Sequence, residues 1–334
     1  MYYITLFSFF IKIMLQYNYT IWSTNLNWLV LVLITILLDS SRIFIDNYVS
    51  DYHFKGKHAV AQKLFYGYAF IIFSLVLMLA NIPDLTNAQP LPLFIFFFSG
   101  LITSFAGIPY YKALELDDST NLGIFIQLAP ILYLILGWLF LDESFSPLQL
   151  LAFIIILSAP LLIILTTRKR SRKIKIKAVF YSFIYVFIAV IANFIFVKQN
   201  SITENLSFIT EMAFLFLGKG IGNLIIIYAR PKWRRRFLSV LKSSHQKVLR
   251  PLFCSCFFGI AKDFSYRAAL TLAPSVALAS AASDSATPIV IFFMGILLTL
   301  IWPKLGREKL DRKSIIVHFI ATALVVTGII ILQI

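Results

Sequence analysis

Cysteine, histidine and acidic residues are scarce in this chain of 334 residues. Both cysteines, Cys254 and Cys256, lie in one apolar stretch, which argues against a disulfide framework or a cysteine metal cage. No Walker sequence, glycine-rich phosphate loop or metal-ligand spacing occurs. The acidic pairs Asp117-Asp118 and Asp142-Glu143 have no histidine nearby. We therefore expect no cofactor, no bound metal and no enzymatic activity.

Apolar residues dominate what is present. They make up 60% of the chain, and its mean hydropathy is +0.86. A soluble chain of this length cannot bury so much apolar surface. Ten segments reach the roughly 20 residues that a membrane-spanning helix needs, and they are too long and continuous for barrel strands. The fold class predicted is therefore an all-α, polytopic membrane protein with 10 transmembrane helices. The expected spans are Leu26–Tyr48, Gln62–Asn81, Pro92–Ala113, Ser119–Leu141, Pro147–Thr166, Lys177–Val197, Leu206–Ala229, Pro251–Thr271, Ser275–Ile301 and Ser314–Leu332.

The first 25 residues are expected to form an interfacial segment. They are aromatic and apolar but are interrupted by Lys12 and Gln16. They lack the basic start and small-residue cleavage site of a signal peptide. An eleventh span within residues 1–22 is the alternative.

Basic residues gather in alternate loops. The first, fifth, seventh and ninth loops hold 23 of the 30 lysines and arginines, and Lys63 is counted at the end of the first. The positive-inside rule then places the odd-numbered loops in the cytoplasm and the C-terminus outside. The net charge of +15 is thus a signal of membrane topology, and we expect no nucleic-acid binding.

The same charges predict an internal duplication. The second and fourth loops contain no lysine or arginine, whereas their counterparts, the seventh and ninth, contain eight and five. Equivalent loops therefore emerge on opposite faces, as a 5+5 inverted repeat requires. We expect a first five-helix repeat over residues 26–166, a basic linker over 167–176 and a second repeat over 177–334.

The seventh loop is expected to form a basic amphipathic helix. Trp233, Phe237, Leu241 and Val248 follow helical spacing, with arginine and lysine elsewhere. Such a helix is typical of a segment that lies on anionic lipid at the cytoplasmic surface.

Two apolar hairpins carry related motifs. The first has Tyr111-Lys112-Ala113-Leu114, then Pro130, then Glu143, and a further helix beginning near Pro147-Leu148-Gln149. The second has Arg267-Ala268-Ala269-Leu270, then Pro288 and Glu308. These motifs resemble the EamA repeat of the drug/metabolite transporter superfamily, and the resemblance runs from about Leu26 to the end of the chain.

That resemblance implies a ten-helix, cofactor-free carrier of small metabolites with both termini in the cytoplasm. The basic residues instead place the C-terminus outside, and we follow the charges. We expect the bacterial inner (plasma) membrane as the location.

Polar residues within the apolar segments are the candidate substrate-binding residues. An ionisable group at mid-membrane costs about 2.5 kcal/mol or more, so it should face the interior of the bundle. The candidates are Asp39, Arg42, Gln127, Asn193, Lys219, Asn223, Lys262, Asp263, Arg267 and Asp284.

Ion pairs that only hold helices together are the alternative to a binding site. Asp39, Arg42 and Asp46 share one helical face and could pair with one another. Asp263 could likewise pair with Arg267, and Asp284 could pair with Lys219 or Lys262.

Two prolines are candidate hinges. Pro130 and Pro288 each remove one backbone hydrogen bond of a helix and can expose a carbonyl to a cavity. The segment Ser275–Ala286 is small at nearly every position, which lets helices approach closely.

Charges of both signs suggest a substrate with both signs, or an anion paired with a proton, and an amino acid or related polar metabolite is the first choice. Lys219, Lys262 and Arg267 could hold a carboxylate or phosphate, and Asp284 or Asp39 an amine or a coupling proton. We expect a secondary-active transporter that works by alternating access and is coupled to protons or to exchange. The alternative is a membrane enzyme or flippase acting on a lipid-linked substrate. The partners considered are membrane lipid, a small-molecule substrate and protons, with a homodimer left open.

Overall fold

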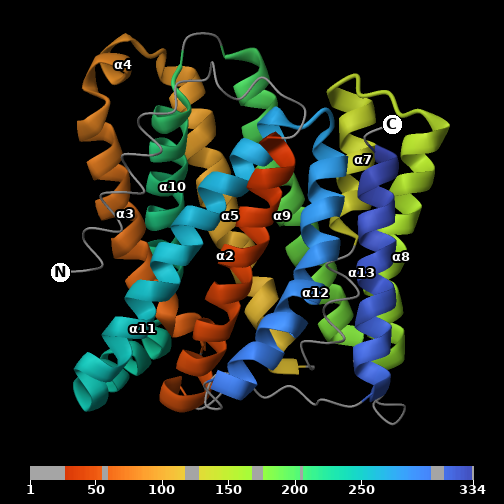
Figure 1. Cartoon of the computed structure of the whole chain (residues 1–334). Coiled ribbons are helices and arrows are strands. Elements are labelled where there is room, and N and C mark those ends of the chain that lie inside the picture. Colours follow the sequence, from red (N-terminus) through yellow and green to blue (C-terminus); the bar gives the residue numbers. More distant parts are fainter. Residues whose placement is uncertain are drawn as a thin grey trace.

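Helices make up the whole of the regular structure in the described residues (Figure 1). The computed structural model describes residues 27–54, 59–116, 128–167, 176–203, 206–301 and 312–332. The all-α prediction is confirmed over this part of the chain. The expected interfacial segment, most of the basic linker, Gln127 and Glu308 lie outside the described residues.

Ten helices of twelve residues or more occur among the described residues, one at each expected span. They are α2 (Asn27–Val49), α3 (Lys63–Ala80), α5 (Pro90–Leu116), α7 (Ala129–Phe140), α8 (Pro147–Thr167), α9 (Ile176–Ile202), α10 (Phe208–Tyr228), α11 (Pro231–Leu272), α12 (Val276–Ile301) and α13 (Arg312–Leu332). Shorter turns are the π-helix η2 (Ser50–Phe54), the 3₁₀ helix η3 (Ala59–Gln62) and α4 (Ile82–Asn87). Only part of the expected Ser119–Leu141 span is described, as α7.

Most of these helices are suited to a bilayer. By length and composition, six of those described can cross a membrane: α2, α3, α5, α9, α10 and α12. Parts of α7, α8 and α13 are shorter apolar helices, and α11 carries three charges in its apolar half. Large apolar side chains stand exposed on the outside of the bundle, with Leu79 and Phe319 each 71% exposed. The protein is therefore a polytopic, all-α membrane protein.

The two halves of the chain pack mainly against each other. The most extensive helix contacts join α2 to α11, α5 to α9 and α10, α3 to α10, and α8 to α13. Each of these pairs joins a helix before residue 168 to one after residue 175. In a 5+5 repeat the first helix, α2, corresponds to the sixth, α9, and the third, α5, corresponds to the eighth, α11. The α2–α11 pair is therefore equivalent to the α5–α9 pair. Both are among the strongest contacts, which agrees with a duplicated architecture.

Glycines bring α10 directly against the backbones of α5 and α3. A Cβ on Gly218 would lie 1.9 Å from the Phe97 carbonyl oxygen, and one on Gly100 would lie 2.0 Å from that of Leu215. Gly220 faces the Gly67 carbonyl of α3 in the same way, at 2.9 Å. Only glycine allows so close an approach, so these positions fix α10 between α3 and α5.

The expected amphipathic helix forms, but its environment differs from the prediction. Residues 231–250 are the first part of the 42-residue α11, which runs obliquely from one end of the bundle to the other (Figure 1). Phe237 and Val248 are buried in a cluster with Phe54 and Ile227, so the apolar face packs on protein. The prediction that this face lies on lipid was wrong, because the ends of α2 and α10 supply a protein surface for it.

Candidate functional site

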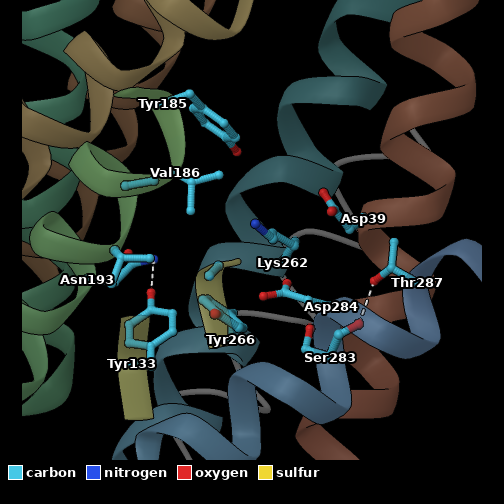
Figure 2. Close-up of a pocket in the computed structure, with 13 residues that line it drawn as sticks. Asp39, Tyr133, Tyr185, Val186, Asn193, Lys262, Tyr266, Ser283, Asp284 and Thr287 are labelled. Atoms are coloured by element: carbon cyan, nitrogen blue, oxygen red, sulfur yellow. Dashed lines mark hydrogen bonds between the residues drawn. The ribbon is translucent and has the colours of Figure 1, made fainter. Parts of the chain in front are cut away.

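A cavity of about 100 Å³ lies between five helices drawn from both halves of the chain (Figure 2). Its lining comes from α2, α7, α9, α11 and α12. The residues are Asp39, Ala129, Tyr133, Tyr185, Val186, Ala189, Val190, Asn193, Lys262, Tyr266, Ser283, Asp284 and Thr287. The small side chains expected over 275–286 bring α12 close enough for Ser283 and Asp284 to reach this wall.

Charges of both signs face the cavity. Figure 2 shows Lys262 beside Asp39 and Asp284. The Lys262 Nζ lies 3.8 Å from Asp263 Oδ1. Asp39 is 2.8 Å from Arg42, and Asp284 accepts a hydrogen bond of 2.9 Å from the Ser280 hydroxyl. The cavity therefore offers one ammonium and two carboxylates to a ligand.

Arg267 lies behind the cavity wall. Its side chain is 1% exposed, and its guanidinium stands 4.4 Å from the ring centroid of Phe196. An Nη2 hydrogen bond of 2.8 Å reaches Asn193 Oδ1, and the Asn193 amide in turn donates to the Tyr133 hydroxyl at 2.8 Å. Arg267 thus contacts the cavity wall through Asn193, which does line the cavity.

Lys219 and Asn223 are buried away from the cavity. Lys219 Nζ lies 2.5 Å from Asp263 Oδ2, and Asn223 Oδ1 accepts a hydrogen bond of 3.1 Å from Lys63. Asp263 therefore pairs with Lys219, and not with Arg267 as one expectation had it. Of the ten predicted residues, Asp39, Asn193, Lys262 and Asp284 line the cavity; Arg42, Asp263 and Arg267 contact those that do.

Comparison with known proteins agrees with this architecture. Residues 56–165 match the EamA-like transporter family. This match confirms the resemblance expected from the motifs over that part of the chain. The matched family is one of transporters.

The fold extends beyond the matched region. A crystal structure of another protein superposes with a TM-score of 0.62 over 92% of this chain and 96% of that chain, at 14% sequence identity. At that identity the likeness concerns the fold alone. No curated protein matches the chain.

The residues of the EamA-like motifs hold structural positions in the bundle. Ala113 is buried against Ala178 of α9. Pro130 lies in the first turn of α7, and Pro288 lies inside α12, one turn after Asp284. Glu143, which follows α7, binds the N-terminus of α12. A hinge at either proline stays a prediction.

Sequence reasoning missed several polar residues of the bundle. Lys63 was counted with the basic residues at the end of the first loop and not as a candidate site residue, yet it begins α3 and is 8% exposed. Only the apolar helical run that starts at Lys63 could have indicated this. Tyr133, Tyr185 and Tyr266 line the cavity but could not be singled out among 15 tyrosines. Among the described residues, no group of three or more histidine, cysteine or acidic side chains could hold a metal.

Proposed function

We propose that this protein is a secondary-active carrier of a small zwitterionic metabolite, with an amino acid as the first choice. The observation that carries the proposal is the cavity wall on which Lys262 stands beside Asp39 and Asp284. An ammonium can bind a substrate carboxylate, and a carboxylate can bind a substrate amine. Tyr133, Tyr185 and Tyr266 add aromatic surface and hydroxyl groups for a small organic body.

The size of the cavity favours a small solute. Its volume of about 100 Å³ is below the roughly 300–1,000 Å³ of most ligand pockets. A flippase or enzyme for a lipid-linked substrate needs room for a long apolar chain beside the polar group. The carrier of a small metabolite is therefore favoured over that alternative.

Alternating access between two inverted halves is supported by an asymmetry in packing. α5 packs closely along α10, whereas α3 and α11, the equivalent pair after exchange of the halves, share much less contact. Inverted halves that trade these two arrangements would open the cavity to opposite sides in turn. We propose residues 26–166 and 177–334 as these halves.

We further propose that the odd-numbered loops face the cytoplasm, in a bacterial inner membrane. Lys232, Lys242 and Arg250 are exposed on the first part of α11, at the end of the bundle opposite α4, which holds Asp84 (Figure 1). Basic residues concentrate on the cytoplasmic side of membrane proteins. Cysteines introduced at residues 242 and 84 should react with an impermeant thiol reagent from opposite sides, and reaction from one side would contradict the orientation. A homodimer stays a prediction.

Uptake of a panel of labelled L-amino acids into proteoliposomes tests the function. Asp284→Asn and Lys262→Met should each slow uptake of the accepted solute by about tenfold or more, since hydrogen bonds to charged groups contribute about 1.5–3 kcal/mol. Asp142→Asn and Lys198→Met are matched controls outside the cavity and should transport normally. Normal kinetics in both cavity variants would sink the proposed site, and a panel in which nothing is carried would sink the substrate class.

A further inference from the structure

Three polar side chains are buried in the membrane-spanning bundle without lining the cavity. Lys63 is 8% exposed, Lys219 is 6% exposed and Asn223 is 4% exposed. Polar and charged groups at this depth are costly, and they mark pathways for ions or substrates more often than plain packing. A role for these residues has to be sought outside the substrate cavity.

The three belong to one file of polar groups that starts at the cavity. Asp263 lies 3.8 Å from Lys262 Nζ on the cavity wall and 2.5 Å from Lys219 Nζ. The Ser104 hydroxyl donates to the Lys219 carbonyl at 2.7 Å, and the Ser104 carbonyl accepts from Lys63 Nζ at 3.1 Å.

Beyond Lys63 the file approaches the end of the bundle. Lys63 also donates to Asn223 Oδ1 at 3.1 Å, and its Nζ lies 5.9 Å from the ring centroid of Tyr111. The Tyr111 hydroxyl accepts a hydrogen bond of 3.2 Å from Gln62, the residue before α3. The file therefore joins the cavity to the end of the bundle at which α3 begins.

Lys63 is held by neutral oxygens. Both of its hydrogen-bond acceptors are uncharged, and within the described residues no ion pair to it is found. Space is made for its ammonium by Gly107, where a Cβ would lie 2.3 Å from Nζ. A lysine without a bound carboxylate can lose its proton without leaving an unbalanced negative charge.

The charged and titratable groups near Lys63 come from several neighbouring helices. Two cations act on it, Lys219 from α10 and Arg42 from α2. The neighbouring carboxylate of α2, Asp46, accepts hydrogen bonds from Tyr66 of α3 at 2.6 Å and Ser255 of α11 at 2.5 Å. Tyr111 is the titratable group that α5 presents. Lys219, in contrast, has a carboxylate partner in Asp263, which it shares with Lys262.

We propose that Lys63 is the proton-binding site of this carrier, and that Lys219 and Asp263 couple it to the cavity. Asp263 is shared between Lys219 and Lys262. A substrate carboxylate that engages Lys262 frees Asp263 to neutralise Lys219 more fully, which weakens the repulsion between Lys219 and Lys63. Binding of substrate then favours the ammonium form of Lys63. By linkage, protonation of Lys63 favours the binding of substrate. The result is symport of one proton with the solute, and this part rests on the proposed function.

Uncoupling of transport from the proton gradient tests the proposal. Lys63→Met mimics the neutral lysine, so counterflow of an accepted amino acid should stay within about twofold of wild type, a change of less than about 0.5 kcal/mol. Accumulation of the solute driven by an inwardly directed proton gradient, with the outside of the vesicles acidic, should disappear. Lys198→Met, which removes an exposed lysine that donates to the Phe140 carbonyl, should keep both activities. Accumulation that persists in Lys63→Met, or loss of counterflow in a folded variant, would overturn the proposal, because Lys63 would then be a structural tie.

A second variant and a second readout protect the test from misfolding. Lys63→Gln retains a donor for the Ser104 and Asn223 oxygens without a titratable proton. If Lys63→Met is not monodisperse, counterflow and accumulation are measured with Lys63→Gln, and the same results are expected. The difference in melting temperature between wild type and Lys63→Gln needs no substrate. It should vary with pH between about pH 5 and about pH 9, where an ordinary lysine stays charged. A constant difference would overturn the proposal even if no amino acid is carried, so the two failures are distinguishable.

Discussion

Glu143 Oε1 accepts a hydrogen bond of 2.9 Å from the backbone N–H of Val276, the first residue of α12. Its Oε2 accepts a second bond of 2.9 Å from the Ser275 hydroxyl. The first N–H groups of a helix lack partners within the helix and carry partial positive charge, so a carboxylate there is stabilising. The contact fixes the cavity helix of the second half to the end of α7 in the first half.

Removing this carboxylate should loosen α12. We expect Glu143→Ala to lower the free energy of unfolding by about 1 kcal/mol, as for the loss of a helix cap. Asp142→Asn is the matched control, because Asp142 has a φ of 54° that asparagine also adopts readily. Thermal unfolding in detergent measures both, and equal midpoints for Glu143→Ala and wild type would contradict the capping role.

The contact between α5 and α10 should not tolerate a methyl group. We expect Gly218→Ala to destabilise the protein by about 1–3 kcal/mol or to prevent its assembly, because the added Cβ would overlap the Phe97 carbonyl. Gly259→Ala is the control, since its Cβ would meet only the flexible Arg42 side chain, at 3.3 Å. Wild-type yield and melting temperature for Gly218→Ala would show that the helices are not in backbone contact.

The buried pair of Lys219 and Asp263 should respond to loss of one partner more than to loss of both. Asp263→Asn leaves the Lys219 ammonium buried without its carboxylate, which costs about 3–5 kcal/mol. Adding Lys219→Met should recover much of that loss. A double-mutant cycle on thermal unfolding measures the coupling, and additive effects of the two changes would exclude a direct interaction.

Asp84, outside the membrane-spanning helices, should make stability depend on acidic pH. Partial burial raises the pKa of Asp84. Hydrogen bonds from Thr210, the Ser207 hydroxyl and the Ser207 N–H lower this pKa by more than burial raises it, so its folded pKa lies below the usual value. Its stabilising contribution is therefore present above the unfolded pKa of about 3.9 and is lost as the pH falls through the lower folded pKa. Melting temperatures from neutral to acidic pH should fall more steeply for wild type than for Asp84→Asn, and parallel curves would refute the effect.

Pro288 should matter more for movement than for stability. Alanine in its place restores a backbone hydrogen bond to α12, so we expect Pro288→Ala to keep or raise the melting temperature and to slow exchange of the transported solute. Pro251→Ala tests the other proline inside a long helix that bears on the cavity and should leave the exchange rate closer to wild type. An unchanged exchange rate in Pro288→Ala would contradict a hinge role for Pro288.

Hydropathy was sufficient to predict the helices, since a bilayer demands long apolar segments whatever their partners. It did not predict which intramembrane charges meet. Lys219 and Lys262 both lie in apolar segments, yet only Lys262 reaches the cavity, because the rotation of each helix depends on packing that no single helix encodes. The distinction between Arg267 and Asn193 has the same origin. α11 was expected to begin at Pro251, but the apolar face of residues 231–250 finds a protein surface and the helix continues through the proline.

The continuity of α11 has a mechanical consequence. At about 1.5 Å per residue, its 42 residues make a rod of about 63 Å. Its first half bears the exposed Lys232, Lys242 and Lys247, and its second half carries Lys262 and Arg267. Raising the anionic lipid content of reconstituted vesicles should therefore alter the exchange rate of wild type more than that of a variant with these three lysines changed to glutamine. Anionic headgroups that bind the first half of α11 would displace the charged side chains of its second half. The lipid composition of the membrane would then regulate the rate of transport.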